Sequence, residues 1–118
     1  MSEAYRRFPR IASNHTVLVT KLDGELEQFA LTRTIAVGGC GFLSNERVGQ
    51  GAIVELLIAL DRENVIKVHG KVVYERTLDD GAVEVGVEFI DITDDDAALI
   101  ERLFDMRERA QFAPPPVM

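Results

Sequence analysis

Three arginines close to the N-terminus have a type and spacing that suggest ligand binding. Arg6, Arg7 and Arg10 lie within five positions of one another in a chain that is acidic as a whole, with 20 Asp and Glu against 13 Lys and Arg. A guanidinium group presents five N–H donors in a fixed plane, which fits phosphate oxygens or the O6 and N7 atoms of guanine and can stack on a base. We expect these arginines to bind a small anionic ligand. The alternative is a solvated basic terminus that aids solubility.

Few side chains in the sequence are suited to catalysis. A nucleophile requires a base within hydrogen-bond reach, and the sequence contains one cysteine, Cys40, and two histidines, His15 and His69. Cys40 lies among glycines beside predicted strand residues, where a cysteine usually acts as a small buried hydrophobic residue. The sequence therefore predicts that the protein is not an enzyme and needs no cofactor. A nucleophilic Cys40 assisted by one of the histidines is the alternative.

Composition and hydropathy narrow the classes of partner. The formal net charge of -7 disfavours general binding to DNA or RNA, because an acidic surface repels the phosphate backbone. No apolar run reaches the roughly 18 residues of a spanning helix, and residues 1–10 lack the apolar core of a signal peptide. Asp94, Asp95 and Asp96 are better explained as helix caps than as cation ligands. We expect a cytoplasmic protein with no metal site, no nucleic-acid partner and no membrane insertion.

Alternating apolar and polar residues predict a mainly β domain followed by one helix. Thr93 has the chemistry of a helix N-cap, and Ile100, Leu103 and Phe104 follow it at helical spacing. Six strands with hairpin-length links and one terminal helix indicate a small antiparallel barrel. The predicted strands span residues 16–20, 26–35, 42–43, 53–60, 65–76 and 83–90.

The sequence also predicts where the chain turns and which side chains share a face of a strand. Asp23-Gly24 predicts a type I′ hairpin turn. The run Gly38-Gly39-Cys40-Gly41 predicts a turn or bulge that needs a positive φ or a close approach of strands. Two sets of side chains are each expected to share one face of a strand: Phe29, Leu31 and Ile35, and Ile66, Val68, Val72 and Tyr74.

Three regions follow from this pattern. Residues 1–13 form a mobile, extended arm that carries the arginines, because Pro9 disfavours helix at the residue before it. Residues 14–110 form a single domain of barrel and helix. Residues 111–118 form a flexible tail in which three consecutive prolines prevent a helix.

These features together resemble the PilZ domain, a bacterial receptor module for the second messenger cyclic di-GMP. The resemblance covers roughly residues 5–109. The first PilZ motif, two arginines separated by three residues, is present as Arg6-Arg7-Phe8-Pro9-Arg10. The second motif, Asp/Asn-x-Ser-x-x-Gly, falls on Thr34-Ile35-Ala36-Val37-Gly38-Gly39, where only Gly39 matches. The resemblance implies an all-β, six-stranded antiparallel barrel of the PilZ type with a C-terminal α-helix.

The resemblance also implies which residues bind the ligand. They are Arg6, Arg7, Arg10, Thr34, Ala36 and Gly39. Thr34 stands where PilZ receptors have an Asp or Asn that accepts from a guanine edge, and Ala36 stands where they have a Ser. We expect both positions to face solvent at a strand end. Leaving one guanine donor unpaired costs about 1–3 kcal/mol, so two lost contacts would weaken binding by roughly a hundredfold.

The resemblance implies a stand-alone domain that binds cyclic di-GMP through its arginine arm and relays the signal to a protein partner. The alternative is a degenerate PilZ protein that does not bind the ligand and acts as an interaction adaptor, for example in pilus or motility control. The arginines favour the first function, and Thr34 with Ala36 favours the second.

Overall fold

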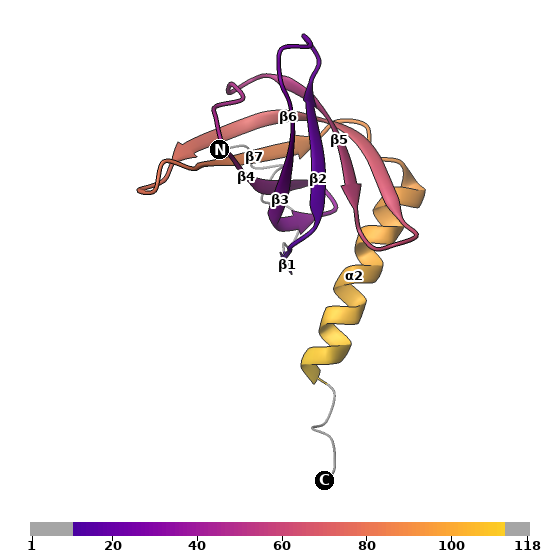
Figure 1. Cartoon of the computed structure of the whole chain (residues 1–118). Coiled ribbons are helices and arrows are strands. Elements are labelled where there is room, and N and C mark those ends of the chain that lie inside the picture. The colour runs from indigo at the N-terminus through magenta and orange to yellow at the C-terminus, as the bar shows by residue number, and fades with distance from the viewer. Residues whose placement is uncertain (1–10, 113–118) are drawn as a thin grey trace.

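Six β-strands close into an antiparallel barrel, and a helix follows the last of them (Figure 1). The computed structural model describes residues 11–112. The elements are β1 (Ile11–Ala12), β2 (Thr16–Lys21), β3 (Glu27–Ala36), β4 (Gly39–Ser44), β5 (Ile53–Ala59), β6 (Val65–Thr77), β7 (Val83–Phe89) and α2 (Asp94–Phe112). The predicted fold class is therefore confirmed, with β1 as an additional strand.

The long strand β3 closes the barrel. The barrel strands lie in the order β3-β2-β5-β6-β7-β4, and β3 also pairs with β4. The first half of β3, residues 27–31, pairs with β2, and the second half, residues 31–36, pairs with β4. β1 pairs with this second half, where Ile11 is opposite Ile35. Closure leaves no barrel strand with a wholly unpaired edge.

Most of the glycine-rich segment lies within a strand, and Gly38 belongs to the turn before it. β4 begins at Gly39, which is paired with Ala36 in β3 and with Glu88 in β7. Neither Gly38 nor Gly39 has a positive φ, so the first of the two predicted reasons for glycine at this turn does not apply. In the described residues a positive φ occurs at Gly24, Gly49, Gly51 and Gly81.

The hairpin between β2 and β3 forms where the sequence predicted it, but its turn is not type I′. Gly24 has a φ of 80° whereas Asp23 does not have a positive φ, and a type I′ turn requires one at both central residues. The Gly24 N–H donates to the carbonyl of Lys21 at 2.9 Å, and Oδ1 of Asp23 accepts from the N–H of Glu25 at 3.0 Å. These bonds stabilise a longer link that spans residues 22–26.

A bulge in β3 changes which side chains face the core. Thr32 is opposite Phe42 and Thr34 is opposite Gly41, so Arg33 has no partner in β4. The extra residue shifts the alternation of inward and outward side chains by one position. Phe29 and Leu31 are therefore 72% and 52% exposed, whereas Ile35 is fully buried. The prediction that these three share one face was wrong for this reason.

A second bulge, at Val73 in β6, also shifts the alternation of inward and outward side chains. Ile66, Val68 and Val72 face the core as predicted, but the register shifts between Val72 and Tyr74. Tyr74 is consequently opposite Gly86, where a Cβ atom would lie 2.0 Å from its ring. The next residue, Glu75, turns its side chain inward and keeps only 2% of it exposed.

The helix α2 packs on the barrel through its first turns. Thr93 is its N-cap, since its Oγ1 accepts from the N–H of Asp96 at 3.1 Å. Ile100 is buried in the barrel core, and Leu103 and Phe104 pack against that core from partly buried positions. Figure 1 shows the helix beginning beside the barrel and extending away from it. The predicted helical stripe is thus a packing face.

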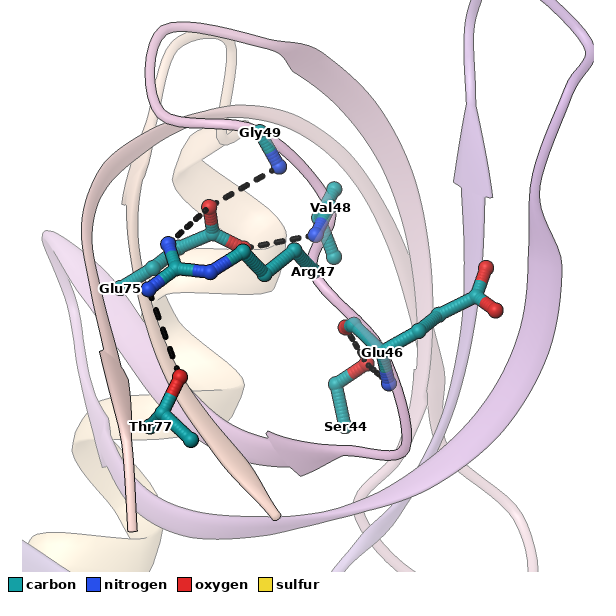
Figure 2. A network of polar contacts seen from close by, with 7 residues as sticks. All are labelled: Ser44, Glu46, Arg47, Val48, Gly49, Glu75 and Thr77. Atoms are coloured by element: carbon teal, nitrogen blue, oxygen red, sulfur yellow. Dashed lines mark hydrogen bonds and ion pairs between the residues drawn. The ribbon is translucent and has the colours of Figure 1, made fainter. Parts of the chain in front are cut away.

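The inward-turned carboxylate of Glu75 fastens the link between β4 and β5 (Figure 2). Its two oxygens accept from the N–H groups of Val48, at 2.6 Å, and Gly49, at 3.1 Å. Arg47 lies over the same carboxylate at 3.7 Å and donates to Oγ1 of Thr77 at 3.3 Å. Both backbone donors would be unpaired without Glu75, so this side chain holds the link against β6.

Glu75→Gln is therefore expected to destabilise the fold. The side-chain amide has one acceptor oxygen, so one of the two N–H groups would lose its partner, at a cost of about 1–3 kcal/mol. Urea unfolding measured by circular dichroism would determine the free energy of unfolding.

Glu84→Gln is the matched control, because Glu84 pairs with the exposed Arg76 at 3.1 Å and no backbone donor depends on it. We expect this control to change the free energy of unfolding by less than about 1 kcal/mol. Equal effects of the two variants would contradict the role assigned to Glu75.

Candidate functional site

The strand β1 brings the start of the described chain to the second motif. Ile11 is opposite Ile35 and Ala12 is opposite Thr34, so β1 lies beside the segment that runs from Thr34 to Gly39. The three arginines of the first motif, Arg6, Arg7 and Arg10, lie outside the described residues. The chain therefore enters the barrel next to the second motif, at the residue that follows the last of these arginines.

A small polar cluster holds β1 and the start of β2 against the bulge in β3. The backbone N–H of Ser13 donates to the carbonyl of Arg33 at 2.9 Å, and the N–H of His15 donates to Oγ1 of Thr32 at 2.9 Å. The Ser13 hydroxyl also hydrogen-bonds to Oγ1 of Thr32 and to Nδ1 of His15. Thr32 is buried, and a buried hydroxyl needs such partners. The cluster fixes where the chain leaves β1.

The residues of the second motif lie close together on β3 and β4. Thr34 and Ala36 share the face of β3 opposite to the buried Ile35, and Ala36 is paired with Gly39 across the turn. Thr34 is half-buried and paired with Gly41. Ala36 is only 1% exposed, so the expectation that it faces solvent was wrong. Burial at this position means that a larger polar side chain there requires a hydrogen-bond partner.

Cys40 is a buried thiol in the centre of a paired strand. It is opposite Ile35 in β3 and Val87 in β7, and it is fully buried. Burial raises the pKa of the Cys40 thiol to about 12, because the charged thiolate is disfavoured away from water. A nucleophile requires the thiolate, so the described geometry does not support the reading of Cys40 as a catalytic residue.

His69 takes part in a surface contact that anchors the segment before α2. Its Nδ1 donates to Oδ2 of Asp91 at 2.7 Å, and its backbone N–H donates to Oδ1 of the same residue at 2.7 Å. These bonds from His69 hold the pKa of the Asp91 carboxyl below its usual value. Nε2 of His69 lies 3.6 Å from Glu55. Sequence reasoning missed this contact, because the two residues are 22 positions apart.

The described part of the chain offers neither a metal site nor a membrane-spanning helix. Among the side chains of residues 11–106, no group of three or more His, Cys, Asp or Glu is arranged to hold a metal ion. No helix in residues 11–112 has the length and hydrophobicity needed to cross a membrane.

The fold agrees with a family-level match. The family model described as PilZ domain matches residues 4–105, which is most of the chain. This protein therefore belongs to the PilZ family, whose members are ligand-binding regulatory modules. Among curated proteins, no sequence match was found.

Solved structures of PilZ proteins have the same fold. The Bacillus subtilis inhibitor of motility, MotI/DgrA, superposes with a TM-score of 0.74 at 16% identity, covering 92% of this chain and 53% of its own. MrkH of K. pneumonia in complex with c-di-GMP gives 0.72 at 21% identity, covering 90% and 54%. The PilZ domain of Escherichia coli YcgR with c-di-GMP gives 0.66 at 14% identity, covering 92% and 98%. This chain thus spans about half the length of MotI and MrkH and nearly all of the YcgR PilZ domain.

The burial of Cys40 leads to a prediction about thiol reactivity. In the native protein, alkylation by iodoacetamide at pH 8 should be slower than alkylation of the unfolded chain by at least a hundredfold, because reaction requires opening of β4. Mass spectrometry of timed samples with and without urea would measure both rates. Rapid labelling of the native protein would contradict the buried position and restore Cys40 as a candidate nucleophile.

Proposed function

We propose that this protein is a cyclic di-GMP receptor module in which the N-terminal arginine arm and the second motif together bind the ligand. The pairing of β1 with β3 carries the proposal. It aligns Ile11, the residue after Arg10, with Ile35, between Thr34 and Ala36. The described chain therefore begins next to the second motif, one residue after Arg10, and a shared binding site requires the two motifs to be close. The complexes of MrkH and of the YcgR PilZ domain with c-di-GMP add support.

The proposed mechanism is an ordering of the arm by the ligand. The two phosphates of cyclic di-GMP attract Arg6, Arg7 and Arg10, and each guanidinium forms charge-assisted hydrogen bonds or stacks on a guanine. The arm then lies on the barrel surface beside Thr34 and Gly39. The exposed surface changes, and a protein partner recognises the change. This gives a domain without catalytic machinery a way to pass on a signal.

One observation favours a second function, a ligand-independent adaptor of the same fold. Thr34 offers one hydroxyl where a carboxylate or amide would accept from guanine, and Ala36 offers no polar atom and is buried beside Gly39. A receptor with both changes loses contacts worth about 1–3 kcal/mol each. An adaptor would act through its protein surface alone, so ligand titration separates the two functions.

The first prediction from this proposal concerns the arginines. Arg6→Ala and Arg10→Ala should each abolish cyclic di-GMP binding, because each removes a bidentate contact with the ligand. Their melting temperatures should stay close to that of the parent protein, since we expect the arm to bury little core surface. Isothermal titration calorimetry and thermal melts measure the two effects.

The matched control is Arg62→Ala, which removes an exposed arginine in the link between β5 and β6. It changes the net charge by the same amount, so the parent affinity should be retained. If the parent binds and the arm variants bind equally well, the arm does not form the site.

The second prediction concerns Thr34. Thr34→Asp supplies a carboxylate that can accept from a guanine edge, and it should tighten binding at least tenfold, or about 1.4 kcal/mol. The control Thr34→Val keeps the shape of the side chain, removes its hydroxyl and should weaken binding. Combining Thr34→Asp with Ala36→Ser adds the hydroxyl of the full motif at the buried position. Absence of binding in every variant, with circular dichroism showing a folded barrel, would leave the adaptor function.

A further inference from the structure

An apolar strip crosses the outer face of the barrel. Phe29 and Leu31 are 72% and 52% exposed on β3, on the outward side that the bulge at Arg33 gives them. Leu31 is opposite Leu43 in β4, Phe29 is opposite Leu18 in β2, and Leu18 is opposite Leu57 in β5. Register partners on one face have their Cβ atoms about 4.5–5.5 Å apart. We call these five residues the outer strip: Leu43, Leu31, Phe29, Leu18 and Leu57.

The outer strip is not part of the barrel core, which is filled by other side chains. The inward side chains of the same strands, such as Val17, Phe42 and Ile58, are fully buried. Nothing in the barrel therefore requires leucine and phenylalanine on the outward side, which antiparallel barrels normally give to polar residues. A continuous apolar area on the surface of a folded domain marks a place where another molecule binds.

Carboxylates flank one side of the strip. Glu27 lies two residues before Phe29 on the same face of β3, and it lines a hollow of about 240 Å³ together with Glu25 and Glu46. All three glutamates are exposed, and none of them forms an ion pair with a side chain of residues 11–106. Figure 2 shows the Glu46 carboxylate pointing away from the network around Glu75. The surface thus combines an apolar centre with an unneutralised acidic border.

We infer that the outer strip and its acidic border bind an amphipathic, basic segment of a protein partner. Apolar side chains of the segment would cover Phe29 and Leu31, and its lysines or arginines would pair with Glu25, Glu27 and Glu46. A second copy of this chain is a poor occupant, because residues 11–118 hold nineteen acidic and ten basic residues. Two such surfaces would bring like charges together.

The outer strip lies away from the proposed ligand site. The inference rests on the proposed function in one respect, the existence of a protein partner. Phe29 lies in the half of β3 that pairs with β2, whereas Thr34 and Ala36 lie in the half that pairs with β4. Ligand and partner would therefore contact opposite ends of one strand, and both could be bound at once.

Two synthetic amphipathic peptides test the inference. One has leucines on one face and lysines on the other, and its counterpart replaces every lysine by glutamate. We expect the lysine peptide to bind, with NMR amide shifts centred on residues 18, 29, 31 and 43, and with an affinity that falls as salt is added. Phe29→Thr should weaken binding at least tenfold, since it removes the central aromatic contact. Glu27→Gln should weaken it to a smaller extent.

Ile90→Thr is the matched control, because Ile90 is 57% exposed outside the outer strip. It should bind the lysine peptide as the parent does. Equal binding of both peptides, or equal affinities of Phe29→Thr and Ile90→Thr, would overturn the inference. A dimer in sedimentation equilibrium that Phe29→Thr dissociates would also overturn it, in favour of a second copy.

A cyclic di-GMP titration of the same samples separates this inference from the proposed function. Phe29→Thr should leave the affinity for the nucleotide unchanged. If the nucleotide binds and the lysine peptide does not, the docking surface is wrong and the receptor function stands. If the peptide binds as expected and the nucleotide does not, the docking surface stands and the protein is the adaptor.

Discussion

Hydrogen bonding along both edges of β3 is the constraint on which the rest of this structure depends. One strand must pair with β2 over its first half and with β4 over its second half, while β1 pairs with that second half. A strand that is hydrogen-bonded to three neighbouring strands must bend, and the bulge at Arg33 provides the bend. The burial of Ile35, the exposure of Phe29 and the place where the N-terminal arm enters all follow from this arrangement.

Much of the fold was predictable from the sequence because it depends on local patterns. The sequence of β7 alternates between valine or phenylalanine and glutamate or glycine, and Thr93 occurs where a helix needs a cap, so each was recognisable alone. The bulges at Arg33 and Val73 were not recognisable, because neither position carries a glycine or another residue that signals a bulge. Their cause lies in the pairing with strands distant in the sequence. The contact of Glu75 with the link after β4 was unpredictable for the same reason.

The sequence indicated which residues belong to the candidate site, but it predicted only part of their arrangement. The motif residues Thr34, Ala36 and Gly39 were located through resemblance to PilZ domains, and the register of β3 with β4 brings them together. The burial of Ala36 depends on packing around the turn, which no motif encodes. The cluster of Ser13, His15 and Thr32 that fixes the exit of β1 was missed, although a threonine at an inward strand position is a usable signal for a buried polar contact.

The bulge at Arg33 also limits how this strand can change in length. Arg33 is the extra residue, so its deletion would leave Thr32 opposite Phe42 and Thr34 opposite Gly41, with Thr32 and Ile35 both still on the inward side. The strand would then alternate regularly and would lose the bend that the bulge provides. Deleting Ala30 instead would turn Phe29 into a core that is already filled. The loss of one residue is thus compatible with both faces of β3 at the bulge, whereas at Ala30 it is not.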